Sequence, residues 1–431
     1  MDALNTSEMN GLQSRFFDED PRRALIDAER HARPPLPIEA PAVVQYIALQ
    51  SQVTDLASER RACLTICENL GLMPSSELTD QIQAVGEGVF LKWERHTEFC
   101  SYTIVQQNVE DRKGFVPWSE RELGWEDVTG NLLVSLVIGI ETKRSRVWKQ
   151  SGMFDWANPL PLCASLVMSG TTQVESDMTI NERGFTRYLV TTSNKEPTRI
   201  GRLVQRLIEI ESYGAFCLYA WKDVKEIGPK LGEAERRLES ITTRLAKHAG
   251  ESDEQMLDEL SEVSAFQEEV TTRSHFRLNA SLAYYEIVQR RLEELREERI
   301  EGCQRLANFI QRRMNPAART YRSILKRQAE TADRTSRATQ LLRGRIEVEI
   351  GKQNQQLLKS MNERAEAQYK LQKTVEGLST VAITYYALGI LAYIAAAIAG
   401  YVPGLGVKEI VGLAVPFVLL TVWLALKRLR K

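Results

Sequence analysis

The chain has 431 residues, which leaves room for two or three structural units. Its 56 basic and 57 acidic residues balance to a net charge of −1, which excludes a whole-protein preference for nucleic acid. The six cysteines have no zinc-ribbon spacing. Cys63 and Cys67 are four apart, and in a reducing cytoplasm we expect them to be small core residues rather than ligands or a redox pair.

Residues 1–197 have the pattern of an α/β domain. Segments rich in β-branched and aromatic residues are separated by turn residues, and most follow one another without a long helix, which favours an antiparallel or mixed sheet with helices on one side. One helix at 54–70 should end at Gly71. We expect strands at 42–50, 89–105 (a bent strand or a hairpin), 131–141, 163–169 and 185–192.

Residues 198–377 predict a long helical stalk. Apolar residues recur at helical spacing over 202–221, and charged helical segments follow at 231–248 and 253–313. Asn315-Pro316 predicts a break or kink, after which a last helix begins. The apolar positions of that helix keep no strict heptad for long, so the pattern favours a helical bundle or loose coiled coil over a long two-stranded zipper.

Residues 378–426 predict two transmembrane helices. The segments 381–399 and 410–426 are apolar and close to the ~20 residues that cross a bilayer, and the Gly- and Pro-rich stretch 400–406 separates them. The alternative, two buried core helices, fits poorly because such helices usually keep a polar face. The predicted fold class is therefore α+β: a sheet domain with helices, a helical stalk and a transmembrane hairpin.

Basic residues predict the orientation of this hairpin. The tail 427–431 reads KRLRK, and Lys370 and Lys373 precede the first span, whereas the connecting loop is neutral. Excess Lys and Arg mark the cytoplasmic side, and the first twenty residues have no secretory pattern. We expect a multi-pass protein of the bacterial inner membrane, with the N-terminal bulk and the C-terminal tail in the cytoplasm.

The best chemical pattern lies in the segment 89–99. Strand alternation places Glu94, His96 and Glu98 on one face, continued by Cys100, and places Trp93, Arg95 and Phe99 on the other. Two carboxylates and an imidazole at this spacing suit a divalent cation, which is the cofactor that the pattern allows. The alternative is a polar sheet face with cross-strand ion pairs.

A second segment precedes the first strand. His31 and Arg33 stand before Pro34-Pro35, which makes a rigid, extended, basic stretch. We expect it to dock on the sheet against Glu94 or Glu98, a structural role. An anion-binding or ligand-binding role is the alternative.

The first span also carries polar and small residues. Tyr386 and Tyr393 are seven apart, and Ala392, Ala396 and Gly400 form a row of small residues that allows close helix packing. These residues could line a pore formed by first-span helices. The alternative is a simple two-span anchor in which the tyrosines lie at the membrane interface.

No hydrolase elbow, Walker loop, dinucleotide fingerprint or HExxH pattern is present in the sequence, so we expect no enzyme.

Three features together resemble a known family. They are AERHARPPLP at 28–37, LKWERHTEF at 91–99, and the hairpin that begins AITYY at 382–386. The chain resembles a bacterial family of C-terminally membrane-anchored proteins known only as a domain of unknown function. The resemblance covers nearly the whole chain and implies membrane anchoring, but no activity.

The order of parts is also similar to CorA-type magnesium transporters. That resemblance implies a homo-oligomeric cation channel gated by a cytosolic domain, with Glu409 as the acidic residue of the external loop. The Gly-Met-Asn motif of that group is replaced here by Gly400-Tyr401-Val402. This departure from the motif argues against magnesium selectivity.

Three hypotheses follow from the sequence. The first, which we favour at this point, is a homo-oligomeric CorA-like channel or transporter. The second is a non-conducting membrane-anchored scaffold or sensor with an unknown protein partner. The third is a membrane-tethered enzyme, which would need a deep cytosolic pocket with convergent polar groups. The lipid bilayer is a partner in all three.

Overall fold

The computed structural model describes residues 20–31, 34–50, 56–78, 80–108, 121–143, 163–247, 252–398 and 406–429. The chain forms two compact units. The first comprises Met1–Ser240 with Ser261–Thr335, and the second comprises Ile241–Leu260 with Ser336–Lys431.

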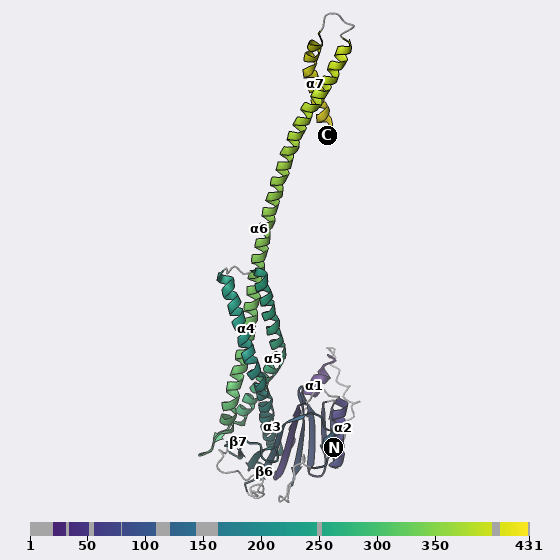
Figure 1. The fold of residues 1–431 in the computed structure, drawn as a ribbon. Coiled ribbons are helices and arrows are strands. Elements are labelled where there is room, and N and C mark those ends of the chain that lie inside the picture. Colours follow the sequence, from purple (N-terminus) through teal and green to yellow (C-terminus); the bar gives the residue numbers. More distant parts are fainter. Residues whose placement is uncertain are drawn as a thin grey trace, which may run out of the picture. The chain divides into compact units, whose positions relative to one another are not determined.

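The first unit is built on one mixed sheet (Figure 1). The strand order is β10-β7-β8-β9-β6-β1-β5-β4-β3-β2. The β6–β9 pair is parallel, and the other pairs are antiparallel. The predicted fold class is therefore confirmed for the sheet. The strands are β1 (Ala42–Gln50), β2 (Met73–Leu78), β3 (Gln81–Val85), β4 (Val89–Arg95), β5 (Phe99–Gln107), β6 (Asn131–Thr142), β7 (Cys163–Val167), β8 (Thr172–Ser176), β9 (Thr186–Thr192) and β10 (Glu298–Arg299).

The predicted strands agree with the structure within about two residues. The segment 89–105 forms the hairpin β4–β5, the second of the two forms that its sequence allows. The pattern missed β2, β3, β8 and β10 because they are short and rich in polar residues, as in MPSSEL and QIQAV. Strands without an apolar run give little periodic signal.

Helices cover both faces of the sheet. Helix α2 covers one face and packs on a cluster centred on Ile66, Leu91 and Trp93. Helix α3 and parts of α4, α5 and α6 cover the other face. Because both faces are covered, β1 is buried along nearly its whole length. The helices are α1 (Arg23–His31), α2 (Leu56–Asn69), α3 (Pro197–Tyr219), α4 (Trp221–Lys247), α5 (Asp253–Leu295), α6 (Leu306–Ile398) and α7 (Val407–Leu429), with a short helix η3 (Trp125–Asp127).

Of the break or kink expected at Asn315-Pro316, the break is wrong. Helix α6 runs through Pro316, and the chain instead breaks between α5 and α6, where Arg296 and Gly302 have positive φ. An interior proline costs a helix about 3 kcal/mol. Burial of Tyr321 one turn later, together with the hydrogen bond from Tyr285 to Asn315, offsets that cost.

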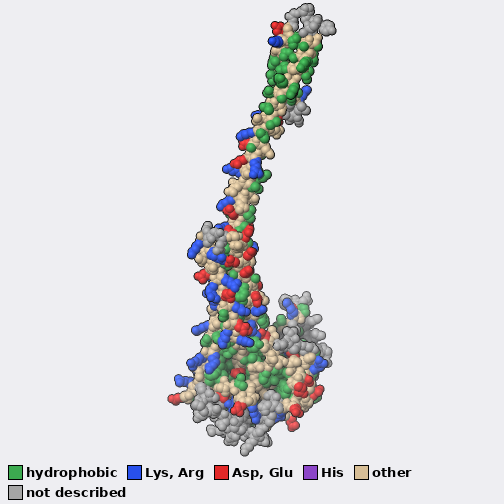
Figure 2. All heavy atoms as spheres, in the orientation of Figure 1, with side chains coloured by type: hydrophobic (Ala, Val, Ile, Leu, Met, Phe, Trp, Pro, Cys, Tyr) green, Lys and Arg blue, Asp and Glu red, His purple; other side chains and the backbone are tan. Residues whose placement is uncertain are grey.

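The second unit holds the end of α6 and all of α7. Both helices are long and apolar enough to span a membrane, with mean hydropathies of 1.7 and 1.9 over their most apolar stretches. Only 11% of the first stretch and none of the second is buried. Figure 2 shows hydrophobic side chains gathered over these two segments. Core helices of a soluble domain would be mostly buried, so this exposure favours the membrane interpretation.

Candidate ligand-binding site

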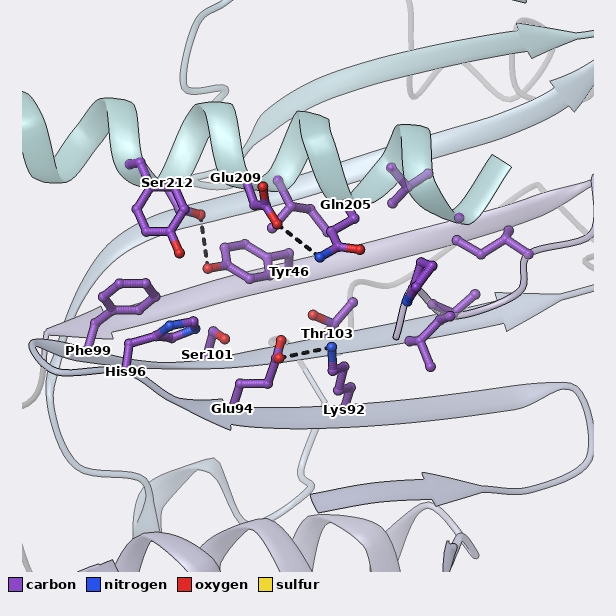
Figure 3. Close-up of a pocket in the computed structure, with 18 residues that line it drawn as sticks. Tyr46, Lys92, Glu94, His96, Phe99, Ser101, Thr103, Gln205, Glu209 and Ser212 are labelled. Atoms are coloured by element: carbon purple, nitrogen blue, oxygen red, sulfur yellow. Dashed lines mark hydrogen bonds and ion pairs between the residues drawn. The ribbon is translucent and has the colours of Figure 1, made fainter. Parts of the chain in front are cut away.

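A cavity of about 100 Å³ lies inside the first unit, between α3 and the strands β1, β4 and β5 (Figure 3). One buried water needs roughly 10–15 Å³ of such space, so the cavity has room for a ligand of a handful of non-hydrogen atoms. Its wall is apolar on one side, where Leu36, Val204 and Ile208 contribute, and polar on the other.

The floor of the cavity carries an ion pair. On β4 the side chains alternate, so Leu91 and Trp93 enter the core under α2 while Lys92 and Glu94 face the cavity. The Nζ atom of Lys92 lies 2.9 Å from Oε1 of Glu94, and the two side chains are 7% and 16% exposed. Charges this poorly solvated need a partner, and each supplies one to the other.

Hydroxyl groups surround this pair. Ser101 and Thr103 of β5 line the cavity beside it. From the roof, Ser212 of α3 donates a hydrogen bond of 2.9 Å to the hydroxyl oxygen of Tyr46 on β1. Burial raises the pKa of Tyr46, and the smaller opposing effect of the hydrogen bonds with Ser212 and Ser101 does not cancel it. Tyr46 is therefore a neutral hydrogen-bonding group at physiological pH rather than a base.

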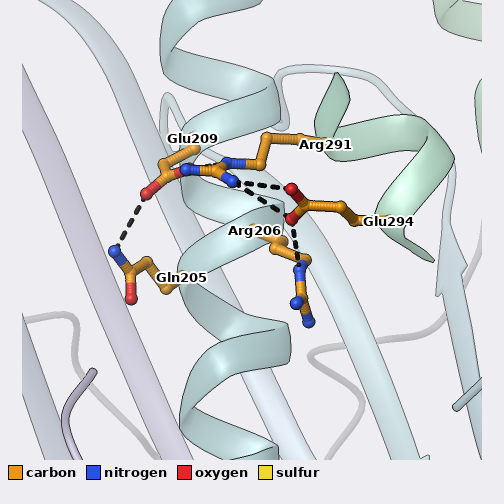
Figure 4. Close-up of polar contacts among 5 residues, drawn as sticks. All are labelled: Gln205, Arg206, Glu209, Arg291 and Glu294. Carbon is orange, nitrogen blue, oxygen red and sulfur yellow. Dashed lines mark hydrogen bonds and ion pairs between the residues drawn. The ribbon is translucent and has the colours of Figure 1, made fainter. Parts of the chain in front are cut away.

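A charged network fixes the outer edge of α3 (Figure 4). Glu209, which lines the cavity, accepts hydrogen bonds from Gln205 at 2.9 Å and from Arg291 of α5. Arg291 also donates to both carboxylate oxygens of Glu294 at 3.0 Å, and Arg206 donates to one of them at 3.0 Å.

This network also shifts the pKa values of its members. Burial lowers the pKa of Arg291, but its pairs with Glu209 and Glu294 outweigh burial and the net shift is upward. Burial raises the pKa of Glu294, but the contacts with Arg206 and Arg291 outweigh it and the net shift is downward. The charged forms are therefore stabilised, and the network holds α3 against α5.

The three residues of the predicted metal site have different surroundings: Glu94 and His96 both line the cavity, whereas Glu98 contacts α5. Glu94 pairs with Lys92, whereas Glu98 accepts hydrogen bonds from Arg277 at 2.6 Å and Tyr284 at 2.5 Å, both on α5. The ring of His96 stacks on Phe99 with 4.1 Å between ring centroids. Among the residues that the structure describes, no group of three or more His, Cys, Asp or Glu side chains is placed to hold a metal ion.

The assumed strand alternation fails at the β4–β5 turn. Strand β4 ends at Arg95 and β5 begins at Phe99, so residues 96–98 form the turn and reset the alternation. Phe99 consequently lines the same cavity as Glu94, and Cys100 enters the core under α2. Continuous alternation holds only within one strand.

The residues of the two predicted structural motifs, at 31–33 and 93–95, are only partly described by the structure. Trp93 is fully buried under α2, and Arg95 lies 3.7 Å from the carboxylate of Glu59 on α2. Arg33 lies outside the described residues. His31 ends α1, and its side chain lies outside them too. Of the residues that follow, Pro35 and Leu36 line the cavity.

The candidate pore residues lie in the second unit. Tyr386 is 70% exposed and Tyr393 83% exposed, while Ala392 is half-buried and Ala396 exposed. Gly400 lies outside the described residues, and Glu409 lies in the first turn of α7.

Sequence reasoning missed most of the cavity. Lys92 stands beside the predicted site and carried a signal of its own, a lysine inside an apolar strand. The α3 residues Gln205, Glu209 and Ser212 gave none, because their meeting with the strands depends on the packing of a distant helix. Mutually paired charges, hydroxyls and an apolar wall suit binding of a small polar molecule.

Fold and site together define a class: an α+β protein with a cavity of mixed polar and apolar lining and two C-terminal helices able to span a membrane. The chain belongs to the family described as protein of unknown function, DUF3422, whose sequence pattern matches residues 18–431. Comparison with curated proteins finds no match.

Proposed function

We propose that this protein is a membrane-anchored sensor or scaffold of the bacterial inner membrane, which binds a small polar ligand in the cavity between α3 and the sheet. The exposed apolar surface of α7 and of the end of α6 carries the proposal. Such surface is costly in water and stable in lipid. The basic residues Lys427 and Arg428 in the last turn of α7 support a cytoplasmic C-terminal end.

The ligand class follows from the lining of the cavity. Lys92 and Gln205 supply donors, Glu94 supplies an acceptor, and hydroxyls line the space between them, while the opposite wall is apolar. A small zwitterion or polyhydroxylated molecule with a short apolar portion matches both walls. The cavity is too small for a nucleotide.

The CorA-like channel is the weaker proposal. The described parts of the two spans, from 381 to 398 and from 410 to 425, contain no acidic residue, arginine or histidine that would mark an ion path. The likeness to that group rests on the order of parts alone. The sensor or scaffold interpretation needs only the anchor and the cavity.

Topology tests the anchor. Glu409→Cys in intact spheroplasts should react with a membrane-impermeant thiol reagent, whereas Lys427→Cys should react only after permeabilisation. The native cysteines in the described residues are buried or half-buried, which keeps the background low. Recovery of the protein in the carbonate-soluble fraction would contradict membrane anchoring, and labelling of Lys427→Cys in intact spheroplasts would contradict the orientation.

Thermal unfolding of the detergent-solubilised full chain tests the ligand. A panel of amino acids, small amines and polyols should include a class that raises the unfolding temperature, since a ligand at 100 times its Kd stabilises by about 2.7 kcal/mol. Glu94→Gln should abolish that shift, and Glu87→Gln, the same change at an exposed turn position, should keep it. An equal shift in both variants would place the ligand elsewhere.

A further inference from the structure

One stretch of α6 has no covering layer within its own unit. Every residue from 347 to 375 is exposed. Large apolar side chains nevertheless recur there: Leu357 is 60% exposed, Met361 57%, Leu371 67% and Val375 56%. Leu378, three residues beyond the stretch, is 75% exposed. A helix needs a packed apolar face to be stable in water, so this stretch requires a partner.

The spacing of these residues identifies the kind of partner. Leu357 and Met361 are four apart, Leu371 and Val375 are four apart, and Leu378 follows three later, which is the alternation of a heptad seam. Ile350 occupies the same seam one heptad earlier. The seam is interrupted by polar residues at Asn354, Arg364 and Gln368, and is therefore loose rather than strict.

Charge follows the same register. Arg364 is the one charged residue in the seam between 350 and 378; the other charged residues lie on the outer positions of the heptad, where a partner helix does not touch them. They are Lys352, Lys359, Glu363, Glu366, Lys370, Lys373 and Glu376. The positions that flank the seam are neutral, among them Ser360, Ala365 and Ala367. Two copies meeting along this seam therefore bring no like-charged flanking residues together, and Arg364 is the one seam position where like charges face each other.

The same register continues into the first span with small residues. Ala382, Gly389 and Ala396 follow Val375 at intervals of seven and are exposed. The buried residues of this span, Thr384 and Ala395, lie at other heptad positions. The hairpin therefore leaves the small-residue face open, and small residues are what membrane helices use for close contact.

We propose that the seam from Ile350 to Leu378 joins α6 to α6 of a second copy of this chain, in parallel and in register. The parallel direction rests on the proposed anchoring, because copies inserted in one membrane with one orientation run the same way. Asn354 at a core position, with leucines at three of the five alternate core positions, favours two strands.

The area is consistent with a dimer held in a membrane. Burial of an apolar side chain removes roughly 60–120 Å² from water, so the six apolar seam residues bury about 500 Å² per copy before the small flanking residues are counted. A standard interface buries about 800 Å² per partner. Confinement to one membrane raises the effective concentration and reduces the area that is needed.

Cysteine cross-linking in membranes tests the seam in the full chain. Gln368→Cys, inside the seam, should form a disulfide-linked dimer under mild oxidation. Lys373→Cys, on the outer face of the same helix, should give roughly tenfold less, because its thiols cannot approach within disulfide distance. Equal cross-linking of the two variants, or none from Gln368→Cys, overturns the proposal.

The mass in detergent gives a second readout. The wild type should have the mass of two copies after subtraction of detergent, Leu357→Asp with Leu371→Asp should have the mass of one, and Lys359→Asp with Lys373→Asp should keep two. A wild-type monomer or a ring of more copies overturns the two-copy proposal. All variants are first recovered from the membrane fraction: their absence from it contradicts the anchor, whereas monomers within it contradict the seam alone.

Discussion

Removal of the Lys92 charge should destabilise the sheet domain through the carboxylate that it leaves behind. Lys92→Met keeps the length of the side chain but leaves Glu94, 16% exposed, without the cation that lies 2.9 Å from it. Breaking a buried pair in this way costs roughly 3–5 kcal/mol of unfolding free energy. Because Glu94 keeps some contact with solvent, we expect the lower end of this range, about 3 kcal/mol. That cost is equivalent to a factor of about 150 in the population of the opened state.

The second variant separates charge from packing. Lys92→Met with Glu94→Leu removes both charges and should be close to wild type or more stable, since burial of the pair costs desolvation that an apolar pair avoids. Lys326→Met is the matched control, because Lys326 and Glu330 form an exposed pair 3.6 Å apart. It should change the free energy of unfolding by less than about 0.5 kcal/mol.

Hydrogen exchange of the β4 and β5 amides measures these free energies in the full chain, because it reports the opening of a chosen segment. The reasoning is refuted if Lys92→Met exchanges like wild type. It is also refuted if the double variant is as unstable as the single one, because the loss would then come from packing rather than from an unpaired charge.

Three further predictions concern α3 and the helices around it. Gly201→Ala should displace the cavity-lining segment at Leu36, since an added Cβ would lie 1.9 Å from the Leu36 carbonyl oxygen. We expect the free energy of opening, measured by hydrogen exchange, to fall by about 3 kcal/mol. Gly214→Ala is the control and should keep the wild-type stability, because the nearest neighbour of its added Cβ lies at 3.9 Å. Burial raises the pKa of Glu211 above 4.5. The contribution of Glu211 to stability is therefore complete below pH 4.5 and is lost as pH rises through the folded-state pKa. Glu211→Gln should remove that part of the pH dependence of thermal unfolding, and an unchanged profile would contradict the assignment. Tyr321→Phe should cost about 1 kcal/mol in denaturant unfolding, because the buried hydroxyl donates to a backbone carbonyl of α3 at 3.0 Å.

Local patterns were sufficient for much of the fold. AVVQYIALQ predicts β1 with its observed bounds, because a run of β-branched and apolar residues between turn signals has few other solutions. The helix before Gly71 ends where the sequence places it, since Gly71 adopts a positive φ of 64°. The two apolar segments near the end of the chain predict spanning helices by length and composition alone.

Other features depended on contacts between distant segments. Pro316 was expected to end a helix, yet packing of Tyr321 and its neighbours carries α6 through it. The metal pattern of Glu94, His96 and Glu98 assumed one continuous strand, whereas residues 96–98 form a turn, and of the three only Glu94 and His96 line the cavity. Arg277, nearly two hundred residues away, then pairs with Glu98.

The sequence by itself determined which segments avoid water and with what period, because apolar burial and backbone propensity act over a few residues. It therefore predicted the apolar strands, the long helices and the apolar hairpin. Strand alternation already places Lys92 and Glu94 on one face of β4. Only the tertiary structure decided that Ser212 and Glu209 of α3 lie over this pair, because a cavity forms where segments far apart in the chain meet. The charged pair lines a cavity only because of these distant neighbours, and no local pattern in the sequence predicts which neighbours they are.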